Sequence, residues 1–563
     1  MTTSEPHQSL SIRETLTSII IAFALAFVFR AFVVEAFVIP TGSMAPTLMG
    51  AHMRFRSPQT GYDWAVDPWD KVGERPKPIQ GDLVNPIRVN DPMSGYPMSK
   101  HGLRRHTGDR ILVLKYLIPF GLRPTRFDAV VFKNPGGPQT NFIKRLIGLP
   151  GEQIALVDGD VFVRTPASTP DDPSIASVWA QPGWKIVRKW DSRDGMRSRR
   201  GLHLQASVWQ PIFSSEFAPL DPELTTAQAS RNRRFRTPWS GDGTGWDLSG
   251  ASYRYAGSGA TALRWDERVR PIVDRNAYNQ ALSESTRSER DGWSTPLKRG
   301  KQFPVSDVRL RCGVEPAGAG LTVAAIVETR GHVFRARFEN DAVSIDMREP
   351  DGTWRNALGA GTVRGLLAPG RVSSLEFWHV DQALHVLVDG RHIASATYGD
   401  DWSPEDRLEH ATGKPIEAIL GQSDPPGGEN PLAVPSLYEQ TGPVIRWEFS
   451  GGPFTLHRVG LDRDLFYRPA TRPSKQPGWS THPSTTRTLT ATQYFACGDN
   501  SANSSDGRMW ESVDPWVAQI DDLAGIVPER LLIGKAFFVY FPSMQRGAVP
   551  LPSPDFGRLR WVW

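Results

Sequence analysis

The chain has 563 residues, which corresponds to roughly three to four domains. With 39% hydrophobic and 22% charged residues it can bury real cores, so wholesale disorder is excluded, and a net charge of +5 is too small an excess to indicate a nucleic-acid-binding protein. The 51 Gly, 47 Pro and 19 Trp favour many short strands joined by turns, and hence a mainly β fold.

The first predicted element is an apolar helix near the N-terminus. Residues 16–29 carry no charge, and the mostly apolar window extends to Val34. A spanning helix needs about 20 apolar residues, which requires Arg30 to lie near the interface. A buried core helix is one alternative; a cleaved signal peptide is another, but it would begin with basic residues, and Met1–Leu10 has none. We predict a transmembrane anchor over residues 12–36, which the few flanking arginines do not orient.

A stiff turn that presents a serine follows this helix. The segment Phe37–Leu48 reads FVIPTGSMAPTL, turns at Pro40–Gly42 and presents Ser43. A glycine before the serine allows the backbone to approach another chain closely, and Pro46 restricts the residue before it. Taken alone, a surface serine in a Pro/Gly turn is sufficient to explain the pattern.

A serine nucleophile needs a base, and a neutral lysine can provide one because burial lowers the pKa of a lysine. The strand-like run Phe142–Ile147 places Lys144 among apolar residues. Adjacent strand residues face opposite sides, so a buried Lys144 can lie beside a charged Arg145; two solvated strand charges are the alternative. The histidines nearest to the serine in sequence show no recognisable triad spacing: His52, His101 and His106.

Five motifs follow one another in a fixed order behind the N-terminal helix. In chain order they are Pro40–Leu48, Thr107–Lys115, Asp128–Phe132 with Phe142–Glu152, Tyr494–Arg508 and Gly525–Ala536. They resemble the motifs of bacterial type I signal peptidases: the nucleophile box, the strand after it, the two-part lysine box, the C-terminal GDNRDNSxDSR box and the closing strand.

The resemblance implies a mostly β catalytic domain with a Ser/Lys dyad. Ser43 would be the nucleophile and Lys144 the general base, and the Ser43 amide and the Thr41 hydroxyl would form the oxyanion hole. Ser504 would orient the Lys144 amine by a hydrogen bond. The physics agrees, since an acyl-enzyme splits peptide hydrolysis into two easier steps and an orienting third group completes a triad-like arrangement.

The resemblance also implies residues that support the site and residues that select the substrate. Two ion pairs would hold the C-terminal loop against the site, Asp499 and Asp506 with Arg145 and Arg508. Shallow apolar pockets would be lined by Phe37, Ile39, Met44 and Ile143. The C-terminal box departs from the family at Ser501 and Ala502, which replace Arg-Asp and put the rigidity of this loop in question.

Residues 50–105 form a first insertion relative to compact family members. Its runs SPQTGY and DPMSGY share the pattern x-Pro-x-x-Gly-Tyr, which resembles the paired knuckles of a zinc ribbon. The four thiols would be replaced by Ser57, Thr60, Asp91 and Ser94. Oxygen ligands hold zinc poorly, so we predict no metal and a small β module packed through Trp64, Trp69 and tyrosines. Coincidental Pro-Gly turns explain the pattern equally well.

A second, larger insertion is expected over residues 164–490. Residues 164–304 contain a Pro/Ser/Asp-rich connector and a region without clear periodicity. Residues 305–490 contain alternating runs of strand length, with a hairpin signal at Asp389-Gly390. These runs predict a jelly-roll-like β-sandwich that resembles concanavalin-like lectins and glucanases. A structural or docking role and glycan binding through exposed tryptophans both remain open.

The sequence therefore predicts an N-terminal transmembrane helix, a β catalytic domain in two parts (residues 37–163 and 491–563) and an inserted β-sandwich. The resemblance implies a serine endopeptidase that removes Ala-x-Ala signal peptides from preproteins leaving the secretion translocon. It would be a single-pass protein of the bacterial inner membrane with an extracytoplasmic catalytic domain. An inactive peptidase-derived membrane scaffold, whose sandwich binds envelope glycans or proteins, is the alternative.

We expect no cofactor, no metal and no nucleic-acid partner. The two cysteines, Cys312 and Cys497, cannot build a disulfide scaffold or a four-cysteine zinc site. They fall in regions assigned to different domains, so two independent buried thiols are expected.

Overall fold

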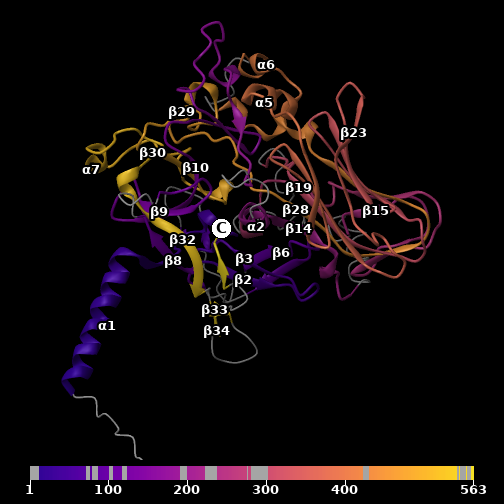
Figure 1. Cartoon of the computed structure of the whole chain (residues 1–563), viewed down its shortest axis with the longest axis horizontal. Coiled ribbons are helices and arrows are strands. Elements are labelled where there is room, and N and C mark those ends of the chain that lie inside the picture. The colour runs from indigo at the N-terminus through magenta and orange to yellow at the C-terminus, as the bar shows by residue number, and fades with distance from the viewer. Residues whose placement is uncertain are drawn as a thin grey trace, which may run out of the picture.

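The computed structural model describes residues 12–70, 77–78, 87–100, 105–116, 123–190, 199–221, 237–275, 277–279, 302–421, 430–541, 544–545, 553–554 and 559–562. Two β-rich bodies lie side by side: one contains the N-terminal and C-terminal parts of the chain, and the other is built from its middle (Figure 1). The mainly β fold predicted from composition is confirmed.

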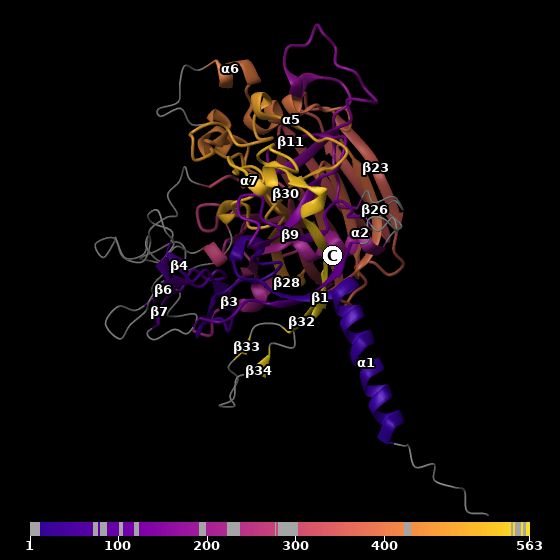
Figure 2. The same cartoon turned by 90° about the vertical axis from the view of Figure 1, so that its left-hand side faces the viewer.

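The N-terminal segment forms helix α1 (Ile12–Phe32), which extends away from the body (Figure 2). Its apolar side chains are largely exposed, for example Ile20 at 66% and Phe27 at 65%. Strand β1 (Val34–Val38) begins almost at once, so the helix ends before the predicted boundary at residue 36. Within the described part of the chain, no helix combines the length and the apolar character needed to cross a membrane.

One antiparallel sheet joins the two distant parts of the body that contains the N-terminal and C-terminal parts of the chain. In it, β9 and β10 from the first part lie between β32 and β30 from the second, so residues separated by the whole insertion become neighbours. The sheet order is β1, β8 (Arg110–Lys115), β32 (Leu532–Phe541), β9 (Ala129–Lys133), β10 (Asn141–Gly148), β30 (Gln493–Cys497) and β31 (Val527–Pro528), with β35 (Arg560–Trp561) beside β32.

A smaller sheet connects this body to the insertion. Its order is β13 (Lys185–Ile186), β12 (Asp160–Arg164), β11 (Gln153–Val157) and β29 (Arg487–Thr488). The hairpin between β11 and β12 carries Asp158 and Asp160, both of which are buried. These carboxylates form ion pairs with Arg330 and Arg407 of the insertion. Arg330 Nε, for example, lies 2.8 Å from Asp158 Oδ2. The hairpin is therefore tied to the sandwich by buried charges.

The first insertion forms the small β module expected from its sequence. It consists of the pairs β2 (Met53–Arg56) with β3 (Asp63–Val66), β4 (Trp69–Asp70) with β5 (Lys77–Pro78), and β6 (Ile87–Asn90) with β7 (Pro97–Lys100). Phe55, Trp64 and Val89 pack in its core. The side chain of Trp69, which was also expected to pack there, lies outside the described residues.

The β-sandwich is larger than predicted and begins earlier in the chain. One sheet has the order β16 (Trp246–Asp247), β17 (Ser252–Tyr255), β28 (Phe454–Arg463), β19 (Val308–Pro316), β24 (Ser373–Val380), β25 (Ala383–Val388) and β26 (Arg391–Thr397), with β14 (Gln210–Ser214) beside β28. The other has the order β15 (Trp239–Gly241), β18 (Thr261–Trp265), β27 (Val444–Ser450), β20 (Thr322–Thr329), β21 (His332–Glu339), β22 (Ala342–Arg348) and β23 (Trp354–Thr362).

The sandwich therefore includes five strands, β14 to β18, from residues 164–304, the region in which the sequence showed no clear periodicity. These strands have two to five residues each, which is too short for alternation to be visible in the sequence, and they are held by pairing with longer strands. The sandwich also ends at Arg463, because β29 belongs to the small sheet.

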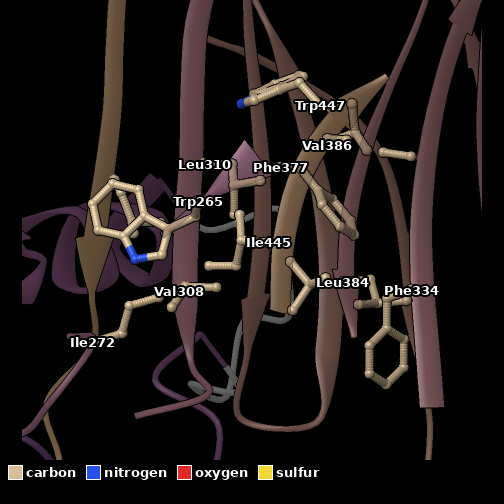
Figure 3. Close-up of a cluster of buried hydrophobic side chains, with 14 of the residues drawn as sticks. Trp265, Ile272, Val308, Leu310, Phe334, Phe377, Leu384, Val386, Ile445 and Trp447 are labelled. Carbon is tan, nitrogen blue, oxygen red and sulfur yellow. The ribbon is translucent and has the colours of Figure 1, made fainter. Parts of the chain in front are cut away.

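Side chains from both sheets fill the sandwich. Trp265, Phe334 and Trp447 from one sheet meet Leu310 and Phe377 from the other in a single buried cluster (Figure 3). The described helices outside the N-terminal segment are short: α2 (Arg199–Val208), α5 (Pro404–Thr412), α6 (Ile416–Leu420) and α7 (Pro515–Ala518).

Two local predictions are confirmed. Asp389 and Gly390, which connect β25 to β26, both have positive φ (49° and 72°), as a two-residue type I′ hairpin requires. Cys312 on β19 and Cys497 on β30 are free and buried.

Candidate active site

Ser43 and Lys144 lie within hydrogen-bond distance although 101 positions separate them. Ser43 is in the single turn η1 (Gly42–Met44) after β1, and Lys144 is on β10. Lys144 Nζ donates a hydrogen bond to Ser43 Oγ at 2.6 Å. Both residues are buried, with 8% and 3% of their surface exposed. The structure thus brings together the hydroxyl and the amine that sequence analysis singled out.

Burial dominates the electrostatics of Lys144. Removal of the amine from water lowers its pKa from 10.5 to about 8, although the Asp506 carboxylate acts in the opposite direction. The ring of Phe142 lies 5.3 Å from Nζ, so the surroundings of the amine are partly aromatic. A substantial fraction of Lys144 is therefore neutral slightly above neutral pH, as a general base requires.

Arg145 faces the other side of β10 and is charged. Its guanidinium binds Asp499 through two parallel contacts, Nε to Oδ1 at 2.7 Å and Nη2 to Oδ2 at 2.6 Å, with both side chains fully buried. Burial alone would lower the pKa of Arg145, but the carboxylate outweighs it and holds this pKa above its ordinary value. The alternative that Lys144 and Arg145 are solvated strand charges is wrong.

The C-terminal loop contains the second predicted ion pair. Arg508 Nε and Nη2 contact Asp506 Oδ1 and Oδ2 at 2.9 and 2.8 Å, and Asp506 also accepts from the Gly498 amide at 2.9 Å. Ser501, one of the residues that depart from the family, accepts a hydrogen bond from Arg508 Nη1 at 2.7 Å. The departure therefore leaves Ser501 inside the network.

Thr41 and Ser504 differ in how well the structure fits their expected roles. Thr41 is exposed, and its hydroxyl lies 3.5 Å from Ser43 Oγ, close to where an oxyanion would form. The predicted hydrogen bond from Ser504 to Lys144 is absent. Among the described residues the buried Ser504 hydroxyl has no hydrogen-bond partner; it lies against Gly498, where a Cβ would come within 2.3 Å of it.

The four residues expected to line the substrate pocket belong to one apolar cluster. Ile39, Met44 and Ile143 are buried in it, and the half-buried Phe37 packs against it. In the chain, Met44 directly follows Ser43 and Ile143 directly precedes Lys144.

Sequence analysis missed two residues that contact the Ser43 turn and a third that contacts one of these two. Asn500 Nδ2 donates to Gly42 O at 2.9 Å, and its backbone amide donates to Ser43 O at 3.0 Å. Asn279 pairs with Asn500, and Tyr278 packs against Gly42. Asn500 lies within the C-terminal box and was recognisable there; residues 278 and 279 lie in a stretch without periodicity and gave no signal.

Two groups of oxygen-bearing side chains in the described residues resemble candidate metal positions, and both make contacts with other groups of the chain. The oxygens of Asp160, Asp307 and Asp381 lie within 4.8 Å of one another, but each carboxylate is paired with an arginine or a lysine of this chain. In the first insertion, Asp91 Oδ2 accepts from Thr60 Oγ1 at 2.6 Å and from Ser94 Oγ at 3.0 Å. The knuckle-like turns are therefore joined by hydrogen bonds among these side chains.

Comparison with known proteins agrees with this geometry. Residues 12–182 and 455–541 match the family model described as "Signal peptidase, peptidase S26". Signal peptidase I of Rickettsia bellii is 25% identical over 162 residues, which is 29% of this chain and 43% of that protein. Signal peptidase I of Rickettsia akari is 27% identical over 197 residues, 35% of this chain and 59% of that protein.

The resemblance to the signal peptidase family is thus confirmed over the two matched stretches, which we call the peptidase part and which flank most of the insertion. The chain spans less than two thirds of the length of these relatives. Among solved structures, the carbohydrate binding module CBM66 from Bacillus subtilis aligns with 40% of this chain and 96% of that module, with a TM-score of 0.21 and 9% identity.

Proposed function

We propose that the protein is a signal peptidase, a serine endopeptidase that removes N-terminal signal peptides from exported preproteins with Ser43 as nucleophile and Lys144 as general base. The observation that carries the proposal is the 2.6 Å contact between the two groups in a buried setting that lowers the pKa of the amine. The match to the peptidase S26 family supports the same reaction class.

In the proposed reaction, neutral Lys144 accepts the proton of the Ser43 hydroxyl as Oγ attacks the carbonyl carbon before the cleavage site. The Ser43 amide and the Thr41 hydroxyl donate to the oxyanion, and one preorganised donor of this kind is typically worth about 3–4 kcal/mol. The Lys144 ammonium then gives its proton to the leaving amine. Lys144 next takes a proton from a water molecule, and this water attacks the ester on Ser43. The Lys144 ammonium then returns the proton to Ser43 Oγ as the acyl group leaves.

We propose that the substrates carry small residues before the cleavage site, as in Ala-x-Ala, and bind in extended form next to the Phe37–Ile39 segment. They would reach the site as they leave the secretion translocon. The exposed apolar side chains of α1 support attachment of the protein to the bacterial inner membrane through this helix, with the peptidase part outside the cytoplasm.

Glycan binding by the sandwich has less support. Within its described strands the one exposed tryptophan is Trp354, at 37%. The guanidinium of Arg335 lies 4.1 Å from the centre of its ring and therefore covers one stacking face. The proposal accordingly assigns the catalytic function to the peptidase part and none to this tryptophan.

The test is cleavage of a preprotein with an Ala-x-Ala signal by wild type, Ser43→Ala and Lys144→Met. We expect losses of at least about 10³-fold for both variants, with mass spectrometry placing an acyl adduct on Ser43. Lys133→Met, which removes an exposed lysine on the neighbouring strand, is the matched control and keeps full activity. Cleavage at equal rates by all four proteins would reject the assignment.

A further inference from the structure

Part of the long insertion lies directly on the turn that carries Ser43. The short 3-10 turn η6 (Ala277–Asn279) is separated from this serine by more than 200 positions. Asn279 Nδ2 donates to Asn500 Oδ1 at 2.6 Å, and Asn500 Nδ2 donates back to Asn279 Oδ1 at 2.9 Å. The two amides thus form a reciprocal pair that fixes how Asn500 is oriented.

The orientation of Asn500 matters because this residue holds the nucleophile turn at two points. Its side chain donates to Gly42 O at 2.9 Å and its amide to Ser43 O at 3.0 Å. Asn500 is only 1% exposed, so water does not replace a lost partner easily. Asn279 therefore acts on Ser43 through one intermediate residue.

Tyr278 supports the same turn from a second direction. A Cβ added at Gly42 would lie 2.2 Å from Tyr278 Cε1, so the ring touches the backbone of the residue before Ser43. The Tyr278 hydroxyl donates to Ala51 O at 2.9 Å, and its carbonyl accepts from the Asp67 amide at 2.9 Å. With 2% of its surface exposed, the ring is fixed between the turn and the first insertion.

The contact of Asn279 with Asn500 falls on the loop whose sequence departs from the family. Ser501 and Ala502 replace an Arg-Asp pair there, and the neighbouring Asn503 donates to Asp67 Oδ2 of the first insertion at 2.7 Å. Asn279 of the long insertion and Asp67 of the first insertion thus both form hydrogen bonds with this loop.

We infer that Asn279 and Tyr278 are positioning residues for the Ser43 nucleophile, so that the long insertion completes the active site. The inference rests on the proposed peptidase function and deepens it. Neither residue contacts the reacting atoms; each fixes the backbone that sets the distance and angle between Ser43 Oγ and Lys144 Nζ. A misplacement of about 1 Å at a reacting group can cost on the order of 10²-fold in rate.

The experiment measures kcat and KM of Asn279→Ala and Tyr278→Leu on the preprotein substrate, per folded molecule and well below each melting temperature. We expect kcat to fall about 10- to 100-fold while KM changes less than about twofold, because substrate contacts are untouched. The control is Asn430→Ala, which removes a buried asparagine of the insertion that bonds Ala470 O and lies outside this network. It lowers the melting temperature but leaves kcat unchanged.

The outcomes separate this inference from the proposed function. If wild type cleaves the substrate and Asn279→Ala does so with an unchanged kcat, the positioning role is wrong while the peptidase assignment stands. If wild type does not cleave, hydrogen exchange at the Asn500 amide gives the second readout. Exchange at least about tenfold faster in Asn279→Ala than in Asn430→Ala supports the role, and equal exchange overturns it.

Discussion

At the scale of single residues, the site depends on two neighbouring cations with opposite environments. Lys144 is buried next to a serine hydroxyl, whereas Arg145 faces a carboxylate that compensates its charge. Since successive strand residues point to opposite sides, one strand can present an amine that loses its proton easily and a guanidinium that never does.

Burial of the Lys144 amine has a cost in stability that a substitution should reveal. A pKa lowered from 10.5 to about 8 corresponds to about 3 kcal/mol between the two protonation states. Between these pH values the unfolded chain binds more protons than the folded one, so stability rises with pH from 8 to 10.5. Lys144→Met should therefore be inactive yet at least as stable as wild type at pH 7.

Chemical denaturation of wild type and Lys144→Met from pH 7 to 10.5 measures this difference. The stability advantage of the variant should be largest below pH 8 and should disappear near pH 10.5. An advantage that does not change with pH, or a variant less stable than wild type throughout, would contradict a buried amine with a lowered pKa.

At the scale of elements, the β11–β12 hairpin shows how the peptidase part holds the insertion. Arg407 is fully buried and binds both Asp158 and Asp160 of the hairpin. Removal of one partner from a buried ion pair typically costs about 3–5 kcal/mol, because the remaining charge is left without compensation.

Arg407→Leu should therefore lower the free energy of unfolding by about 3–5 kcal/mol, measured by urea denaturation. Arg264→Leu is the matched control, since Arg264 pairs with Asp242 on the surface of the sandwich and both side chains are nearly half exposed. This control should cost no more than about 1 kcal/mol. Equal losses for the two variants would show that the buried pairs do not hold the hairpin.

The β25–β26 turn gives a separate prediction for local geometry. Gly390 has a φ of 72°, and space around it is open, so only the backbone conformation penalises a side chain there. Gly390→Ala should cost about 1–2 kcal/mol, the price of a left-handed residue. Thermal unfolding of the variant and of wild type measures this loss of stability, and an unchanged melting temperature would exclude the type I′ turn.

At the scale of the whole molecule, the long insertion contacts the rest of the chain at several places. Buried ion pairs join it to the β11–β12 hairpin, and η6 contacts the nucleophile turn. We expect the two bodies to unfold together, in one calorimetric transition. The backbone amides of β10 and β19 should then lose their protection from hydrogen exchange under the same conditions. Two well-separated transitions would show that the sandwich is an independent module.

The sequence predicted the parts of the fold that follow local rules. Ser43, Lys144 and the Arg145–Asp499 pair were recognisable because short motifs carry them, and the Asp389-Gly390 turn because its φ angles demand such residues. Strands β14 to β18 were not predictable, since they are too short to show a period and depend on pairing with distant strands. Tyr278 was missed for the same reason, because only tertiary packing brings it to Gly42.

The most direct test of the account is the protonation of the Lys144 amine in the folded protein. NMR titration of lysine side chains labelled with ¹³C and ¹⁵N, with Lys144→Met used to assign the signal, reports this pKa independently of turnover. The account predicts a midpoint near pH 8, matching the midpoint of the rise in kcat/KM with pH. A midpoint near 10.5, the ordinary value of a lysine, would contradict it, because the amine would then be charged at neutral pH, where the proposed reaction needs it neutral.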